Sequence, residues 1–264
     1  MTDRTTSARG DPPVAILTGL SHPVGAAIAR RFARAGNRLL LADGPPGLRT
    51  EIETAARAMG GEAAAPDRTG DEGDADTIVG AALSRFGRLD MLIRGPERGG
   101  DEAWLAAGAS TDGPGRQLES FLRLTRAAIR PMIDGDGGRI VHVVSAAGRY
   151  RSAYMQAEGM PASFALGASR DGAILAATRQ LAFELAPRKI RLNAVAMGLI
   201  RTPETEAVWR GLSERDRQFL SEEISLQRLG EPEEVAAVVE FLASPASSYV
   251  TGTAIDVNGG WWMS

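Results

Sequence analysis

The feature that most constrains the fold is an alternation of short apolar runs with longer segments of helical periodicity. Val14–Leu17 and Arg38–Ala42 are apolar runs typical of buried strands, and Val24–Ala35 between them repeats its apolar residues at helical spacing. Alternating strands and helices favour a parallel sheet with right-handed crossovers and helices on both faces. The sequence therefore predicts an α/β fold with a single doubly wound parallel sheet.

The same alternation continues to the end of the chain. Further strands are expected over Glu62–Ala65, Met91–Ile93, Arg139–Val144, Ile190–Ala196 and Thr253–Val257, and further helices over Gly47–Met59, Asp74–Phe86, Arg116–Met132, Ser163–Leu185 and Pro232–Leu242. No internal repeat or break in composition marks a second domain. We expect residues 13–264 to form one domain, preceded by a disordered polar tail over residues 1–12.

Composition narrows the classes of partner. The formal net charge of −3 provides no basic field for nucleic acid or anionic lipid, so we expect neither partner. The absence of cysteine excludes disulfides and thiolate metal sites, and two histidines are too few for a histidine-rich metal site. No apolar run approaches the roughly 20 residues that span a bilayer, and no signal peptide begins the chain. We therefore expect a cytoplasmic protein without a metal.

Three stretches resemble the short-chain dehydrogenase/reductase (SDR) family, and the resemblance covers nearly the whole chain after Asp11. They are the loop Thr18–Gly25, the strand and turn Ile140–Gly148, and the C-terminal segments Ile190–Pro203 and Arg228–Gly260. The resemblance implies a Rossmann-like sheet that binds a nicotinamide dinucleotide at the carboxyl ends of its strands.

The first stretch has the form of an anion-binding loop. A strand, a glycine-rich turn and a helix N-terminus present backbone N–H groups and the helix dipole to a phosphate. Gly19 and Gly25 match the first and last glycines of the family pattern, and Ser21 is a further candidate cofactor-binding residue. Pro23 stands where the family has its middle glycine, which impairs the cradle because proline adds a ring and removes a donor. Ser21 or His22 is expected to cap the helix.

Two aspartates follow the next strands. A carboxylate at the position of Asp43 binds the adenosine ribose hydroxyls in dinucleotide folds and repels a 2′-phosphate, which favours NAD over NADP. The alternative is an ordinary turn aspartate before Gly44. Asp67 follows the third strand, where the family often has an aspartate near the adenine.

The catalytic positions of the family are altered. The resemblance implies a serine, a Tyr-x-x-x-Lys segment and an asparagine, and Ser145 matches the serine. Counting back from Leu181–Pro187 places Gly167 at the tyrosine and Asp171 at the lysine. A slip of one residue gives Leu166 and Arg170 instead, so neither register supplies a tyrosine.

These replacements remove the expected proton donor. Glycine has no side chain for proton transfer, and loss of a positioned acid or base lowers a rate by about 10²–10⁴. Asp171 reverses the charge of the lysine, whereas Arg170 keeps a positive charge and is a candidate cofactor-side cation. The alternative, which we favour, places Arg170 and Asp171 on a solvated helix face. Gln117 falls at the asparagine position and keeps the amide.

Two more departures fall at positions that lie along the bound cofactor in the family. Arg94–Glu97 replaces the Asn-Asn-Ala-Gly turn of the family, and Met197-Gly198 replaces its Pro-Gly. The scaffold positions remain ordinary, which indicates that the cofactor chemistry is relaxed or replaced.

Three functions are compatible with this pattern. The first is a non-catalytic subunit that forms a homotetramer, or a hetero-oligomer with an active SDR subunit, through the two long helices and the last strand. Trp261-Trp262 is expected to bury at such an interface. The segment Ile200–Ser225 is expected to form a mobile helical cover over a small-molecule ligand.

The second is an NAD-dependent oxidoreductase for an alcohol or ketone. It would use Ser145 and a relocated acid or base, Tyr154 or Tyr150, from the loop Ala146–Pro161. The third is a non-redox enzyme that reuses the cleft with Ser145, Gln117, Arg170 and Asp171. The sequence does not identify the substrate.

Overall fold

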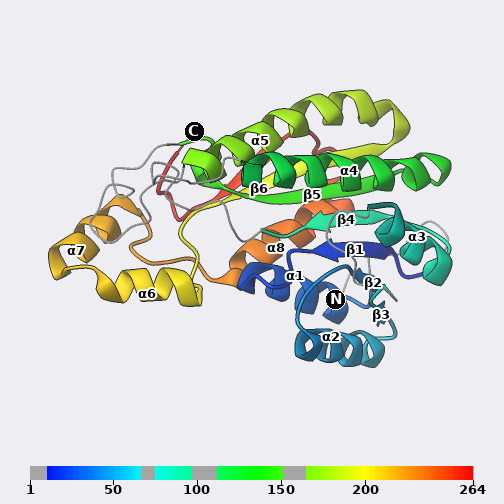
Figure 1. Ribbon diagram of the computed structural model, residues 1–264, viewed down its shortest axis with the longest axis horizontal. Helices are drawn as coiled ribbons and strands as arrows, with labels where there is room; N and C mark the ends of the chain where they lie inside the picture. Colours follow the sequence, from blue (N-terminus) through cyan, green and yellow to red (C-terminus); the bar gives the residue numbers. More distant parts are fainter. Residues whose placement is uncertain (1–10, 67–74, 97–111, 151–164, 264) are drawn as a thin grey trace.

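Seven parallel strands form one sheet in the computed structural model, which describes residues 11–66, 75–96, 112–150 and 165–263 (Figure 1). The strands are β1 (Val14–Thr18), β2 (Arg38–Leu41), β3 (Glu62–Ala64), β4 (Met91–Arg94), β5 (Gly138–Ser145), β6 (Ile190–Met197) and β7 (Ala254–Val257). Their order is β3-β2-β1-β4-β5-β6-β7. The predicted doubly wound parallel sheet is confirmed.

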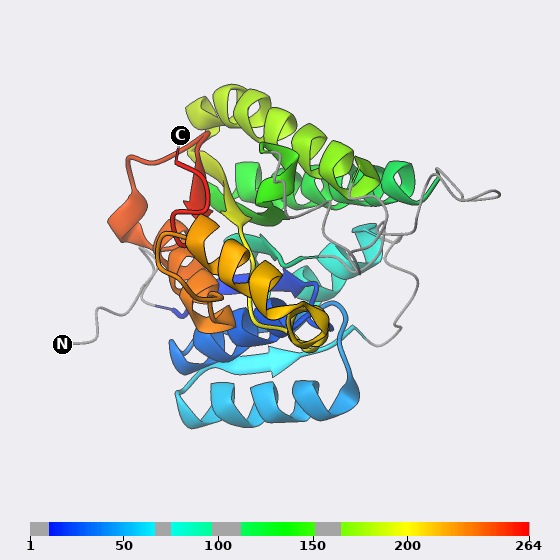
Figure 2. The same ribbon diagram turned by 90° about the vertical axis from the view of Figure 1, so that its left-hand side faces the viewer.

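Helices cover both faces of this sheet (Figures 1 and 2). One layer holds α1 (Pro23–Arg34), α2 (Pro46–Ala58) and α8 (Pro232–Ala243), and the other holds α3 (Ala75–Phe86), α4 (Asp112–Asp134) and α5 (Ala165–Leu185). The expected elements are found within a few residues. The largest difference is that α4 begins at Asp112, before the expected Arg116.

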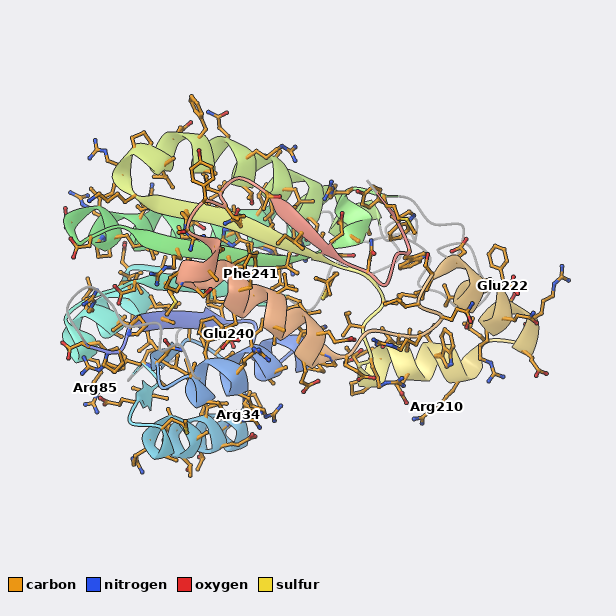
Figure 3. All side chains as sticks on the ribbon, turned by 180° about the vertical axis from the view of Figure 1, so that it is seen from behind. Arg34, Arg85, Arg210, Glu222, Glu240 and Phe241 are labelled. Carbon is orange, nitrogen blue, oxygen red and sulfur yellow. The ribbon has the colours of Figure 1, made fainter. Side chains whose placement is uncertain are left out.

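Two short helices extend beyond the sheet at its carboxyl end. They are α6 (Pro203–Gly211) and α7 (Glu214–Glu223), and Figure 3 shows Arg210 and Glu222 on this projection. Thr202 caps α6 and Ser213 caps α7 through their side-chain oxygens. The expected helical cover over Ile200–Ser225 is therefore present as two capped helices.

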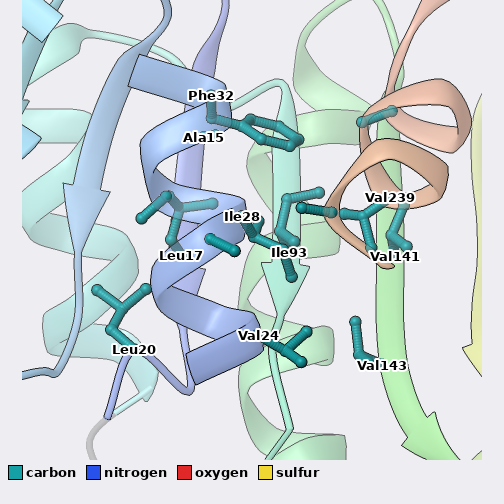
Figure 4. Close-up of a cluster of buried hydrophobic side chains, with 14 of the residues drawn as sticks. Ala15, Leu17, Leu20, Val24, Ile28, Phe32, Ile93, Val141, Val143 and Val239 are labelled. Carbon is teal, nitrogen blue, oxygen red and sulfur yellow. The ribbon is translucent and has the colours of Figure 1, made fainter. Parts of the chain in front are cut away.

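The core explains why the strands are continuous apolar runs. Ala15 and Leu17 of β1 face the layer of α1 and α8, and Val14 and Ile16 face the layer of α3 and α4. A strand buried on both faces has no polar side to alternate with its apolar side. Figure 4 shows the first cluster, in which Ile28 of α1 lies among the side chains of the central strands.

The strand order reverses between β1 and β4. The chain runs from β1 outward to β2 and β3, and then crosses back to β4 on the other side of β1. In open α/β sheets a ligand crevice forms at such a point, outside the carboxyl ends of the strands. The fold therefore places the candidate site at the ends of β1, β4, β5 and β6.

Candidate functional site

A cavity of about 370 Å³ opens at the carboxyl ends of β4, β5 and β6. Ser145, Gly167, Arg170 and Asp171 line it, so the structure brings these predicted residues together. Further lining residues come from the loops after the strands and from the start of α6: His22, Gly95, Pro96, Ala147, Met197, Gly198, Thr202, Glu204 and Thr205. The volume is within the usual range for a small-molecule site.

Asp171 is the most buried charged residue in this wall. Its side chain is 2% exposed. One carboxylate oxygen accepts a hydrogen bond from the backbone N–H of Ser145 at 2.9 Å, and the other accepts one from the Nε of Arg170 at 2.7 Å. Arg170 also donates to the side-chain oxygen of Gln117 at 2.6 Å. The expectation of a solvated helix face for Arg170 and Asp171 is wrong, because tertiary contacts with β5 and α4 bury this part of α5.

Ser145 ends β5 at the cavity, as its match to the family serine predicts. Its hydroxyl oxygen accepts a hydrogen bond from the N–H of Ala147 at 3.1 Å and so caps the turn Ala146–Gly148. Gly167 is buried at the cavity wall. The position that the gap-free register assigns to the family tyrosine therefore presents no side chain to the cavity.

Of the two tyrosines proposed as substitute proton donors, the structure describes only Tyr150. The Tyr150 hydroxyl lies 3.5 Å from a carboxylate oxygen of Asp256 in β7, and its ring stacks on Trp262 with centroids 5.5 Å apart. Tyr150 is not among the described residues that line the cavity. Tyr154 lies outside the described residues.

Two backbone N–H groups of the glycine-rich loop already bind the side chain of Asp43. The backbone N–H groups of Gly19 and Leu20 donate to the two carboxylate oxygens of Asp43 at 2.6 and 2.7 Å. Burial raises the pKa of Asp43, and these two hydrogen bonds oppose the rise. Asp43 therefore organises the glycine-rich loop, which is a different role from the local turn aspartate of the alternative prediction.

The helix that follows the loop is capped by histidine. The Nδ1 of His22 accepts a hydrogen bond from the N–H of Val24 at 3.2 Å, and Pro23 is the first residue of α1. Of the two expected caps, His22 fills the role and Ser21 is exposed. Asp67 lies outside the described residues.

Close backbone packing leaves no room for a side chain at the two glycines that match the family pattern. A Cβ on Gly25 would lie 2.0 Å from the carbonyl oxygen of Gly19. Gly19 has a φ of +75°, and its Cβ would lie 2.7 Å from the carbonyl carbon of Gly95 in the turn after β4. These glycines therefore allow α1 and the two loops to approach, as the family pattern implies.

The described residues fit a nicotinamide dinucleotide at one end only. At the adenosine end, Asp43 retains the position of a ribose ligand, although both of its oxygens already accept backbone hydrogen bonds. At the other end lies the buried carboxylate of Asp171, which the predicted register places at the ribose-orienting lysine of the family. The residues at this end therefore do not fit a catalytically bound dinucleotide.

A polar group at the cavity wall was missed by the sequence analysis. Arg94 ends β4 and is 6% exposed, and His142 on β5 is 1% exposed. The ring of Phe121 from α4 lies between them, 4.5 Å from the His142 ring and 5.5 Å from the Arg94 guanidinium carbon. Burial and the charge of Arg94 hold the pKa of His142 well below its usual 6.5. A histidine inside an apolar strand run was the available signal.

The C-terminal tryptophans belong to a cluster that includes α7 of the same chain. Trp261 is 9% exposed, packs with Leu220 and Ile224, and donates its indole N–H to Glu223 at 3.0 Å. Trp262 stacks between Trp261 and Tyr150. Trp261 is therefore largely buried within its own chain, and the expected burial of the pair at a subunit interface stays a prediction.

Two classes of feature are missing from the part of the chain that the structure describes. No helix there is long and apolar enough to cross a membrane. Nor do these residues hold a cluster of three or more histidine, cysteine or carboxylate side chains that could bind a metal ion.

Comparison with known proteins agrees with this fold. A family model described as enoyl-(acyl carrier protein) reductase matches residues 19–262. The 3-oxoacyl-(acyl-carrier-protein) reductase FabG of Thermotoga maritima is 32% identical over 256 residues, which cover 94% of this chain and 96% of the reductase.

Solved structures share the fold over almost the whole length. A putative short-chain alcohol dehydrogenase from Sinorhizobium meliloti has a TM-score of 0.80 at 26% identity, with 98% of each chain covered. A 7α-hydroxysteroid dehydrogenase in complex with NADH and 7-oxo glycochenodeoxycholic acid has a TM-score of 0.79 at 26% identity, covering 98% of this chain and 97% of that one.

Proposed function

The chain belongs to the short-chain dehydrogenase/reductase family, and from that premise we propose that it is a member that does not transfer hydride. The observation that carries this proposal is the environment of Asp171. In the place of the lysine of the family pattern stands a buried carboxylate, held by the Ser145 N–H and the Arg170 guanidinium. A lysine cannot be replaced by this group without reversal of the charge beside the nicotinamide ribose.

The tyrosine position supports the same conclusion. Gly167 cannot donate or accept a proton, and Tyr150 contacts Asp256 and Trp262 instead of lining the cavity. Loss of a general acid or base lowers a rate by about 10²–10⁴. We therefore propose that the cavity binds a small molecule without oxidation or reduction.

The cofactor preference is a separate part of the proposal. Members of this family typically bind NAD or NADP. Should a dinucleotide bind here, the carboxylate of Asp43 favours NAD, because its negative charge would repel the 2′-phosphate of NADP.

We also propose that the chain acts as a subunit of an oligomer, either a homotetramer or a hetero-oligomer with an active SDR subunit. Large apolar side chains on the outer layer support this: Leu122 and Ile133 of α4, and Phe183 of α5, whose exposed fraction is 79%. Apolar groups of this size on neighbouring helices are typical of protein interfaces. Native mass spectrometry after purification from the source cells would identify a second SDR chain or a single-component tetramer.

A turnover assay tests the non-catalytic proposal. The purified chain is mixed with NADH or NADPH and a panel of ketones and 3-oxoacyl thioesters, and an active family member serves as the positive control. We expect a rate at least about 10²-fold below that of the control. A comparable rate would overturn the proposal, and its loss in Tyr154→Phe, with Tyr150→Phe as the matched control, would identify a relocated proton donor.

A further inference from the structure

The cavity has two walls that come from different parts of the fold. One wall includes Val144 of β5 and Ile174 of α5, and the other includes Glu204 and Thr205 of α6. The first wall is part of the sheet and its helix layer, whereas α6 and α7 project beyond the sheet. Contacts that join the projecting helices to the sheet side therefore help to set the width of the cavity.

Each wall belongs to its own apolar cluster. Val144 and Ile174 are members of a cluster on the sheet side, against which Tyr150 packs. A second cluster holds α6 and α7 together, with Leu220 of α7 in its centre and other members from both helices. Of the described members of these two clusters, only Trp262 is common to both. The sheet-side cluster and the α6–α7 cluster are therefore joined through the side chain of Trp262.

The junction is a stack of three aromatic rings. The Trp262 ring lies 5.5 Å from the Tyr150 ring and 4.1 Å from the Trp261 ring between centroids, with interplanar angles of 17° and 23°. Both ends of the stack are anchored by hydrogen bonds. The indole N–H of Trp261 donates to Glu223 of α7 at 3.0 Å, and the Tyr150 hydroxyl lies 3.5 Å from Asp256 of β7. The stack therefore runs from the turn after β5 to α7.

Hydrogen bonds also fix the backbone that carries Trp262. The side chain of Asn258 donates to the carbonyl of Trp262 at 2.9 Å and accepts from the N–H of Gly260 at 2.9 Å. The N–H of Leu226, just after α7, donates to the carbonyl of Gly259 at 2.9 Å. The last residues of a chain are usually poorly ordered unless such contacts tie them down. Trp262 is therefore held in place between the two clusters.

We propose that Trp262 is a latch that couples the two walls of the cavity, so that loosening the turn after β5 also loosens α6 and α7, and the reverse. The coupling is reciprocal, because an energetic link between two sites acts equally in both directions. A ligand that orders one wall therefore orders the other. This inference goes beyond the proposed function and does not depend on whether the chain transfers hydride.

Amide hydrogen exchange of the full chain, followed by mass spectrometry, tests this latch. Tyr150→Leu removes the ring at the sheet end of the stack, and Tyr150 is not a described member of the α6–α7 cluster. We expect amide exchange in α7 to become about three- to tenfold faster, the effect of losing one aromatic pair. Tyr249→Leu, at a fully exposed tyrosine, is the matched control and should leave exchange in α7 unchanged.

Two further variants separate the stack from other causes. Tyr150→Phe keeps the ring and loses the hydroxyl, so exchange in α7 should stay as in the wild type. Trp261→Leu, at the other end of the stack, should speed exchange in the turn after β5, and Tyr150→Leu alone decides if this variant does not fold. Unchanged exchange in α7 in Tyr150→Leu would overturn the proposal. An equal rise in Tyr150→Phe, or a rise of the same size in the distant helix α2, would overturn it as well.

Discussion

At the scale of single residues, one side chain changes the character of the cleft. The backbone N–H of Ser145 and the guanidinium of Arg170 both bond to Asp171, which is almost fully buried. Removing one partner of a buried ion pair leaves the other charge uncompensated, and this costs more than the loss of an exposed pair. Asp171 is therefore a structural residue of the site.

This contrast predicts the stability of two carboxylate variants. Asp171→Ala should lower the free energy of unfolding by about 3–5 kcal/mol, because the Ser145 N–H and the Arg170 charge lose their acceptor. Glu119→Ala, which removes an exposed pair with Arg123, should cost less than about 1 kcal/mol. Urea denaturation of both variants measures the difference, and similar losses in the two would contradict the structural role of Asp171.

At the scale of elements, the contact between α1 and the β1 loop depends on the absence of a side chain. Gly25→Ala would place a Cβ 2.0 Å from the Gly19 carbonyl oxygen, so we expect a loss of about 3 kcal/mol or more in the free energy of unfolding. Gly80→Ala in α3 meets no heavy atom within 4 Å and should stabilise the protein by about 0.5–1 kcal/mol. Thermal unfolding compares the two, and a tolerated Gly25→Ala would refute the close contact.

The start of α8 gives a prediction about pH. Hydrogen bonds from Arg228 and from the backbone N–H of Glu231 lower the pKa of Glu234 from its usual 4.5 to about 2. Because the folded-state pKa is the lower one, this carboxylate stabilises the fold above pH 4.5 and loses that contribution as the pH falls toward about 2. Glu234→Gln should therefore melt below the wild type at pH 7, with the gap closing between pH 4.5 and 2. A gap that stays constant over this range would contradict the assignment.

The elements themselves could be predicted from the sequence, since a strand such as Val14–Thr18 that is buried on both faces has to be a continuous apolar run. The environment of Arg170 and Asp171 could not, because adjacent charged residues near a helix start look the same whether solvent or another strand faces them. The structure settles this through the Ser145 N–H, 26 positions away. His142 was passed over for the same reason, as its neighbour Arg94 comes from another strand.

At the scale of the whole molecule, a standard family scaffold surrounds a cleft that we propose to be altered. The strand order and the glycine contacts between the loops agree with the family, and Gly167 and Asp171 line the cavity at the carboxyl ends of β4, β5 and β6. The apolar clusters that hold the sheet and its helices together do not include Gly167 or Asp171. The scaffold can therefore be kept by packing while the chemistry of the cleft changes.

The measurement that tests this account most directly is calorimetric titration of the purified protein with NADH and then with NADPH. We propose that the Asp171 carboxylate stands in place of the ribose-orienting lysine, and Asp43 already binds the loop amides. The account therefore predicts no tight binding of either, with dissociation constants above about 1 mM. Micromolar binding of NADH would contradict it, since the cleft would then hold a working cofactor site despite the buried carboxylate of Asp171.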